Sequence, residues 1–180
     1  MKLSIRDLII CSLFASITAI LSQISIPLPF TTVPLTMQVF AVMLCGMLLG
    51  SKLGFISQII YLAIGAIGIP VFAQMSGGPG VILGPTGGFL LSFPIVCFIV
   101  GYFSNKVKSE FLVVIGMVVA LFISYLIGTF QFCLIMHVSF ISGLMACVLP
   151  FIVIDIIKIG LVYVVGMSVC KRVNLGVGKC

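Results

Sequence analysis

Two charged residues lie in an otherwise apolar stretch near the C-terminus, PFIVIDIIKIG at residues 150–160. Asp155 and Lys158 are three residues apart, so on a helix they share one face. In a membrane helix that begins near residue 146, they would lie on the order of 12–18 Å from its outer end. Each charge alone costs about 2.5–3.5 kcal/mol at such a depth, so charged residues there usually face a ligand site or a transport pathway. The alternative is an ion pair that only joins helices.

Several uncharged polar residues lie near the ends of the apolar runs or inside them. Gln38 opens one run, Gln74 follows the next, and Thr86 lies in a glycine-rich stretch. Thr36 precedes Gln38, and Tyr125 lies inside a later run. For each of them, a hydrogen bond between helices and a contact to a ligand both remain open.

Two connectors are rich in proline and glycine, and both are uncharged and rather apolar. The first is PLPFTTVP at residues 27–34, and the second contains SGGPGVILGPTGG at 76–88, with six glycines and two prolines. Such a backbone cannot face lipid, because its N–H and C=O groups would have no partners there. Their apolar side chains favour lids that pack over the helix ends. An ordinary ordered extracellular loop is the alternative.

The composition sets the fold class in which these residues must be positioned. Of the 180 residues, 62% are hydrophobic and only 7% are charged, and the mean hydropathy is +1.46. A soluble domain normally carries about a quarter charged residues. We therefore expect an all-α integral membrane protein that forms one six-helix transmembrane domain over residues 1–180. The rule of about 20 apolar residues per span predicts helices at roughly 8–26, 36–50, 53–72, 88–104, 112–136 and 146–170.

The basic residues predict the orientation of these spans. With the N-terminus in the cytoplasm, all basic residues except Lys158 fall on the cytoplasmic side: Lys2, Arg6, Lys52, Lys106, Lys108, Lys171, Arg172 and Lys179. This one-sided pattern is typical of plasma-membrane proteins and places both termini in the cytoplasm. Because the positive charges flank apolar runs, the net charge of +6 indicates a lipid bilayer as partner and no nucleic acid.

Several motifs of enzymes and metal proteins are absent from the sequence. There is no GxxxxGK[ST] phosphate loop, no HExxH and no GxSxG. No two of the seven cysteines are spaced as CxxC, so we expect no metal site. A small helical protein with a buried polar pair and no means of using ATP is typical of a binding subunit that other proteins energise, so we expect no enzyme.

Four stretches together resemble one known family. They are PLPFTTVPLTMQ at 27–38, LGSKLGFISQIIYLAIGAIGIPVFA at 49–73, SGGPGVILGPTGGFLLSFP at 76–94 and PFIVIDIIKIGLVYVVG at 150–166. They are similar to the BioY proteins, the biotin-specific substrate-binding (S) subunits of energy-coupling factor (ECF) transporters. The resemblance implies six helices and a biotin site near the outer face, with lids from the two connectors. It also implies a transmembrane coupling subunit and two ATPase subunits that hydrolyse the ATP, so this chain needs no cofactor. The family's Ala-x-x-x-Ala contact with the coupling subunit matches Ala15 and Ala19.

Biotin offers two ureido N–H donors, a ureido carbonyl, an apolar fused ring and a carboxylate. Asp155 can accept from the N–H groups, and Lys158 can donate to the carbonyl or meet the carboxylate. Glycine lets backbone N–H groups approach a ligand closely, and aromatic walls suit the ring. We therefore expect the ligand residues to be Asp155, Lys158, Thr86, Gly87, Gly88, Gln38, Phe30, Phe72 and Gln74. An S subunit for another small vitamin, an intramembrane enzyme and a structural membrane partner remain the alternatives.

Overall fold

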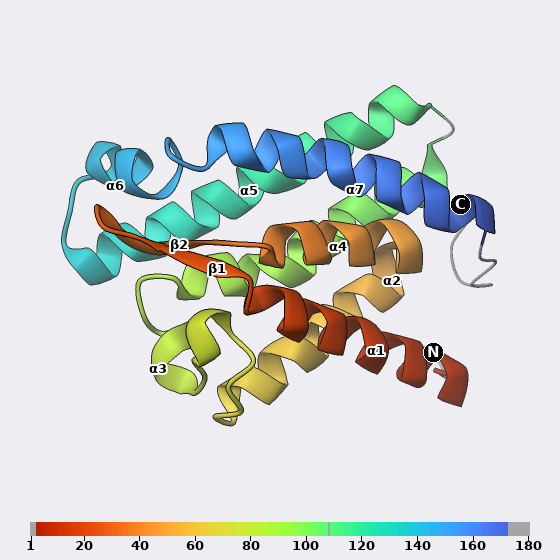
Figure 1. Cartoon of the computed structure of the whole chain (residues 1–180), viewed down its shortest axis with the longest axis horizontal. Helices are drawn as coiled ribbons and strands as arrows, with labels where there is room; N and C mark the ends of the chain where they lie inside the picture. Colours follow the sequence, from red (N-terminus) through yellow and green to blue (C-terminus); the bar gives the residue numbers. More distant parts are fainter. Residues whose placement is uncertain (1–2, 108, 173–180) are drawn as a thin grey trace.

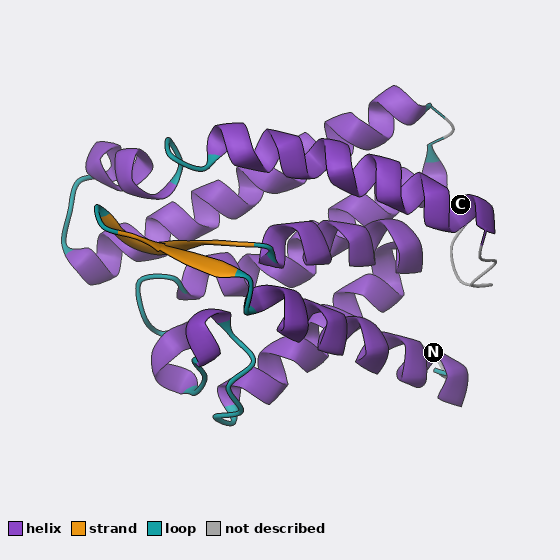
Figure 2. Cartoon of the chain, in the orientation of Figure 1, coloured by secondary structure: helices purple, strands orange, loops and turns teal. Residues whose placement is uncertain are grey.

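The structure, a computed structural model, describes residues 3–107 and 109–172 and is mostly helical (Figures 1 and 2). The helices are α1 (Ile5–Ser22), α2 (Gln38–Ala66), the 3-10 turn η1 (Ala73–Met75), α3 (Pro79–Ile82), α4 (Gly87–Lys106), α5 (Glu110–Met136), α6 (Phe140–Cys147) and α7 (Ile152–Arg172). Within the described residues, α1, α2, α4, α5 and α7 are long and apolar enough to cross a membrane. The basic residues Lys2, Lys108 and Lys179 lie outside the described residues.

Helix α2 contains most of the predicted spans 36–50 and 53–72 and is broken at Gly50. The predicted end of the third span at residue 72 was wrong, because the helix ends at Ala66. Gly50 has φ 77° and ψ 179°, a conformation open almost only to glycine. The chain turns back there: residues 46 and 54, on either side of the break, lie so close that a Cβ added to Gly54 would be 3.3 Å from Cα of Gly46. The polar turn predicted at residues 50–54 is thus a single-residue break, and it gives α2 two arms that lie side by side.

The first connector is a β-hairpin, so the all-α expectation was wrong there. Strand β1 (Ser25–Leu28) pairs antiparallel with β2 (Thr31–Thr36), and Ser25 faces Thr36 in the register. Strand β2 carries three threonines and a valine, β-branched residues that favour strands, and the pairing satisfies backbone groups that an open loop would leave without partners.

The sixth predicted span, 146–170, begins later than expected. Helix α6 ends at Cys147, a turn follows, and α7 begins at Ile152. Pro150 in this turn has no N–H and cannot continue a helix from α6. Asp155 therefore lies in the first turn of α7. The prediction that Asp155 and Lys158 lie 12–18 Å from the outer end of one continuous helix was therefore wrong. Helix α6 is a separate short helix that precedes α7.

The molecule has two distinct ends (Figure 1). The hairpin, α3 and α6 lie at one end, while the start of α1, the bend of α2 and the end of α7 lie at the other. Broken α2 is central, because it packs against α1, α4 and α7. Large apolar side chains remain exposed on the outer faces, such as Phe111, Phe122 and Phe130 on α5. This surface suits lipid tails and would be costly in water.

Candidate functional site

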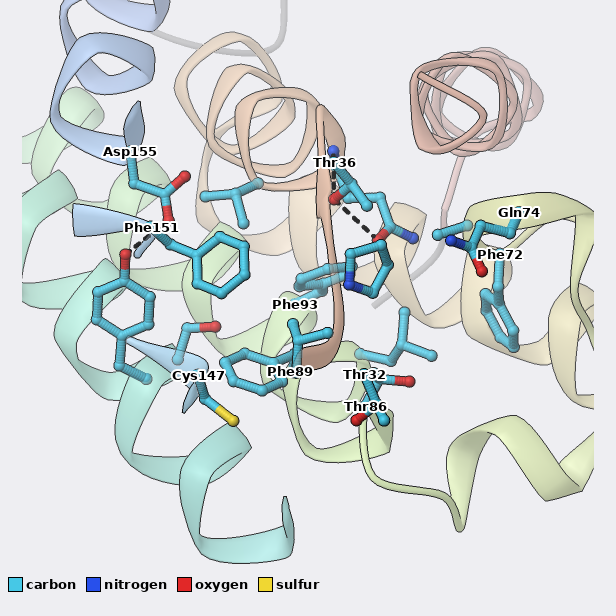
Figure 3. A pocket seen from close by; sticks show the side chains of 18 of the residues that line it. Thr32, Thr36, Phe72, Gln74, Thr86, Phe89, Phe93, Cys147, Phe151 and Asp155 are labelled. Carbon is cyan, nitrogen blue, oxygen red and sulfur yellow. Dashed lines mark hydrogen bonds between the residues drawn. The ribbon is translucent and has the colours of Figure 1, made fainter. Parts of the chain in front are cut away.

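A cavity of about 150 Å³ lies at the end of the bundle that carries the hairpin. Strand β2, the turn 72–76 and helices α4, α5 and α7 contribute its walls (Figure 3). The residues that line it are Thr32, Val33, Pro34, Thr36, Gln38, Val39, Phe72, Ala73, Gln74, Ser76, Val81, Thr86, Phe89, Leu90, Phe93, Leu121, Ser124, Tyr125, Cys147, Phe151, Asp155 and Lys158. Segments far apart in the sequence therefore meet at one cavity, whose lining combines aromatic and aliphatic side chains with hydroxyl, amide and charged groups.

The charged pair stands in this cavity and is tied to two other elements. Lys158 Nζ lies 2.7 Å from Asp155 Oδ1 and donates a second hydrogen bond to the backbone oxygen of Thr36, also at 2.7 Å. The hydroxyl of Tyr125 on α5 donates to Asp155 Oδ2 at 2.6 Å. Asp155 and Lys158 are each only 4% exposed. The pair is thus buried and neutral overall, and it links α7 to α5 and to the hairpin.

The pair still has unused hydrogen-bonding capacity. An ammonium group carries three donors, and Lys158 uses two of them in the bonds above. A carboxylate can accept about four hydrogen bonds, and Asp155 accepts one on each oxygen. A ligand that offers both N–H donors and a carbonyl oxygen can therefore bind here without breaking the pair. Within the part of the chain that the structure describes, no group of three or more His, Cys, Asp and Glu residues could hold a metal ion.

Four further residues expected at the site also line the cavity. They are Gln38, Phe72, Gln74 and Thr86. The side chain of Gln38 is already engaged, since Nε2 donates to the Tyr61 hydroxyl at 2.7 Å and Oε1 accepts from Thr36 Oγ1 at 3.2 Å. Thr86 stands at the start of α4. Figure 3 shows Phe72 and Gln74 on the opposite side of the cavity from Asp155.

Three expected residues do not line the cavity. Phe30 lies at the tip of the hairpin and is 65% exposed. Gly87 and Gly88 are buried at the start of α4. A Cβ on Gly87 would collide with the backbone oxygen of Ile82, and a Cβ on Gly88 would lie 2.7 Å from the backbone oxygen of Ile127. These two glycines allow α4 to pack closely against its neighbours, a role that their sequence context did not distinguish from ligand contact.

Sequence reasoning missed several lining residues or left them undecided. Tyr125 is the most important, because it holds the carboxylate of Asp155. The sequence feature that could have identified Tyr125 is that it is the only tyrosine in the apolar run 112–136. Thr36 was considered for its hydroxyl, whereas its backbone oxygen is what holds Lys158. Phe93 and Phe151 gave no signal, since phenylalanine is common in any membrane helix.

The two alanines expected at a partner contact differ in exposure. Ala15 is 2% exposed and belongs to the core of the chain, while Ala19 is half-buried. Helix α1 packs mainly against α2 and leaves Leu13 and Ile20 exposed on its other face. Ala15 serves the packing of the chain itself, and Ala19 packs at the edge of the same core.

Comparison with known proteins identifies related sequences over nearly the whole chain. The sequence model of the BioY family matches residues 1–175. The probable biotin transporter BioY of Pyrococcus horikoshii is 44% identical over 153 residues, which are 85% of this chain and 89% of that protein. The biotin transporter BioY of Thermotoga maritima is 34% identical over 166 residues, which are 92% of this chain and 96% of that protein.

A solved structure shares the architecture. It is the crystal structure of the S-component for biotin from an ECF-type ABC transporter, which superposes with a TM-score of 0.89 and 26% sequence identity. The match covers 98% of this chain and 96% of the other. The arrangement of helices and hairpin described above is therefore that of an ECF S-component.

Proposed function

Because this chain belongs to the BioY family, we propose that it binds biotin in the cavity and serves in biotin uptake as the S subunit of an ECF-type transporter. The chain is a multi-pass membrane transport protein and not an enzyme. The observation that carries the proposal is the buried group formed by Asp155, Lys158 and Tyr125, which lines a cavity together with aromatic side chains and uncharged polar groups.

Charge decides which part of biotin meets this group. Asp155 and Lys158 neutralise each other, so they offer no net attraction for the biotin carboxylate. The neutral ureido ring carries N–H donors beside a carbonyl acceptor, which complements a carboxylate that stands 2.7 Å from an ammonium. We place the ureido ring at this pair and the valeryl carboxylate toward the mouth of the cavity.

The rest of the cavity suits the apolar part of the same ligand. Phe89, Phe93 and Phe151 line it and offer aromatic surface to the fused ring system. Burying apolar area contributes about 25 cal/mol per Å², while the few polar groups fix the orientation of the ligand. The hairpin and the turn 72–76 form the wall that separates the ligand from the outside.

We further propose that the chain crosses the plasma membrane six times, with each arm of α2 counted as one crossing. The described ends of the chain lie at the same end of the molecule, as an even number of crossings requires (Figure 1). With the basic residues on the cytoplasmic side, both termini are cytoplasmic and the cavity opens to the outside.

Transport needs energy that no motif in this chain supplies. We propose that a transmembrane coupling subunit and two ATPase subunits provide it, that they alone hydrolyse ATP, and that the coupling subunit contacts α1. The exposed apolar residues of α1, among them Leu13 and Ile20, offer a surface to a second membrane protein as well as to lipid.

Thermal melting of the purified chain with a panel of vitamins tests the ligand. Biotin should raise the melting temperature in a concentration-dependent manner, because a ligand that binds only the folded state stabilises it by mass action. Thiamine and riboflavin should leave it unchanged. Stabilisation by another vitamin and not by biotin would contradict the proposed ligand, and stabilisation by none would favour a structural partner.

A further inference from the structure

The turn at residues 72–76 forms one wall of the proposed biotin cavity. Phe72, Gln74 and Ser76 all line it. The ring of Phe72 is 1% exposed and meets the ring of Tyr61 edge-on, with centroids 5.5 Å apart. The backbone conformation of this turn therefore sets the shape of that wall.

The backbone of this turn is strained. Gln74 has φ 59° and Met75 has φ 54°, so two successive residues other than glycine adopt the left-handed region. Side chains with a Cβ rarely occupy this region, and a run of two is rarer still. Two backbone hydrogen bonds close the turn, from Phe72 N to Ser76 O at 2.9 Å and from Ser76 N to Ala73 O at 3.3 Å. Such strain persists only when the surrounding structure holds it in place.

A side chain from another element holds both sides of the strained turn. Gln23 is the C-cap residue of α1, and its Nε2 donates to the backbone oxygen of Phe72 at 3.0 Å. Its Oε1 accepts from the backbone N of Met75 at 2.9 Å. A carboxamide can donate and accept at once, whereas a carboxylate can only accept. Nε2 also lies 2.7 Å from Ser22 Oγ and 3.2 Å from Ala19 O, which ties the amide to its own helix. Gln23 does not line the cavity, so its effect on a ligand there would pass through the turn.

The neighbouring residue adds a further hydrogen bond. Ser22, at the end of α1, lies with its hydroxyl oxygen 2.7 Å from the backbone oxygen of Val71. The end of α1 thus holds the chain from residue 71 to residue 75. The residues that follow α1 begin the hairpin, whose first strand starts at Ser25. The hairpin and the turn 72–76, which both contribute walls of the cavity, therefore both adjoin the end of α1.

We propose that Gln23 is a positioning residue for the biotin site, which keeps the turn 72–76 in its binding-competent conformation without touching the ligand. This inference rests on the proposed function. Without the Gln23 amide, residues 74 and 75 can relax to negative φ, and only a fraction of molecules then carries the competent wall. The apparent affinity for biotin is then the intrinsic affinity multiplied by the fraction of molecules in the competent conformation.

Calorimetric titration of biotin into the purified full-length chain tests this role. Gln23→Ala should weaken binding by about three- to tenfold, the effect of one or two net hydrogen bonds. Gln23→Glu should weaken it at least as much, because it keeps the acceptor for Met75 but loses the donor to Phe72. Ser16→Ala is the matched control on α1: the Ser16 hydroxyl is exposed and bonds only to Ser12 O of its own helix, so binding should not change.

A rescue separates positioning from general destabilisation. Met75 is 67% exposed and does not line the cavity, so Met75→Asn can be made without altering the contact surface. Asparagine tolerates the left-handed region better than methionine. The double variant Gln23→Ala/Met75→Asn should therefore recover most of the lost affinity, and Met75→Asn alone should bind as the unmodified chain does.

Unchanged affinity in Gln23→Ala would overturn the inference, as would a loss that Met75→Asn does not restore. A Gln23→Ala chain that melts at a lower temperature but binds biotin with full affinity would also overturn it, since Gln23 would then serve only stability. If the unmodified chain binds no biotin, the proposed function itself fails and this inference with it.

Discussion

Lys158 on α7 donates a hydrogen bond from Nζ to the backbone oxygen of Thr36 at the end of β2, over 2.7 Å. The two residues are 122 positions apart in the sequence. The same ammonium group holds the carboxylate of Asp155, so the charged pair and the hairpin are positioned together. A ligand that binds the pair therefore acts directly on the segment that covers the cavity.

Removing the hydroxyl of Tyr125 should weaken biotin binding. Tyr125→Phe keeps the ring but deletes the hydrogen bond to Asp155 Oδ2, which orients the carboxylate toward the cavity. We expect an affinity about three- to tenfold lower by calorimetry, a smaller loss than that of a direct charge-assisted contact, because Asp155 keeps its bond from Lys158 and loses only one of its two orienting partners. Tyr102→Phe is the control, since Tyr102 is 49% exposed and lies outside the cavity. Equal affinities for both variants would contradict the role of Tyr125.

The break in α2 should depend on glycine at position 50. Gly50→Ala would place a Cβ against Nδ2 of Asn105 and force alanine into a conformation open almost only to glycine. We expect a loss of about 1–3 kcal/mol in the free energy of unfolding. Gly160→Ala on α7 is the matched control, because its Cβ would meet nothing within 4 Å. A denaturant titration in detergent that shows equal stability for the two variants would contradict this account.

Labelling from outside the cell should distinguish the two ends of the molecule. On a background without cysteines, Gly80→Cys next to the cavity should react with a membrane-impermeant maleimide, and Lys52→Cys should not. The site at Gly80 is open, since an added Cβ there meets nothing within 4 Å. Reaction at position 52 without reaction at position 80 would reverse the proposed orientation.

A bulky residue on α1 should disturb the partner and leave the ligand site intact. Ala19 is half-buried on α1, the helix that we propose the coupling subunit contacts, so Ala19→Leu should prevent close approach of a second helix. We expect less coupling subunit in a pull-down and unchanged biotin affinity. If the pull-down is unchanged, Ala19 belongs to the internal packing of the chain, as Ala15 does.

Features that depend on hydrophobic patterning could be predicted from the sequence. The apolar runs predicted α1, α4 and α5 to within four residues at each end, because lipid requires continuous apolar length. The chain reversal at residues 50–54 followed from its glycines. The hairpin was missed because its strands are short and interrupted by Pro27 and Pro34, which usually argue against a strand. The break between α6 and α7 was missed because Pro150 was read as lying inside the sixth span.

The site was predicted where a residue type is unusual for its surroundings. Asp155 and Lys158 stand out in an apolar run, and both line the cavity. Phe30 and Gly87 were chosen from residue type and neighbourhood, and neither lines it. The bonds that hold the site run through backbone oxygens, such as that of Thr36, and any residue supplies one. Such partners depend on the three-dimensional fold and leave no signal in the residue type.

Calorimetric titration of biotin into Asp155→Asn, Lys158→Met and the double variant, each with a thermal melt, tests the central claim most directly. Asparagine keeps the size of aspartate without its charge, and methionine keeps the lysine stem without a donor. Charge-assisted hydrogen bonds contribute about 1.5–3 kcal/mol, so each single variant should bind roughly ten- to hundredfold more weakly while still folding, and the double variant should bind no better. If the pair only stabilises the fold, each single variant strands a buried charge and should misfold, and the double variant should recover both stability and full biotin binding. Full binding by the double variant would contradict the ligand role of Asp155 and Lys158.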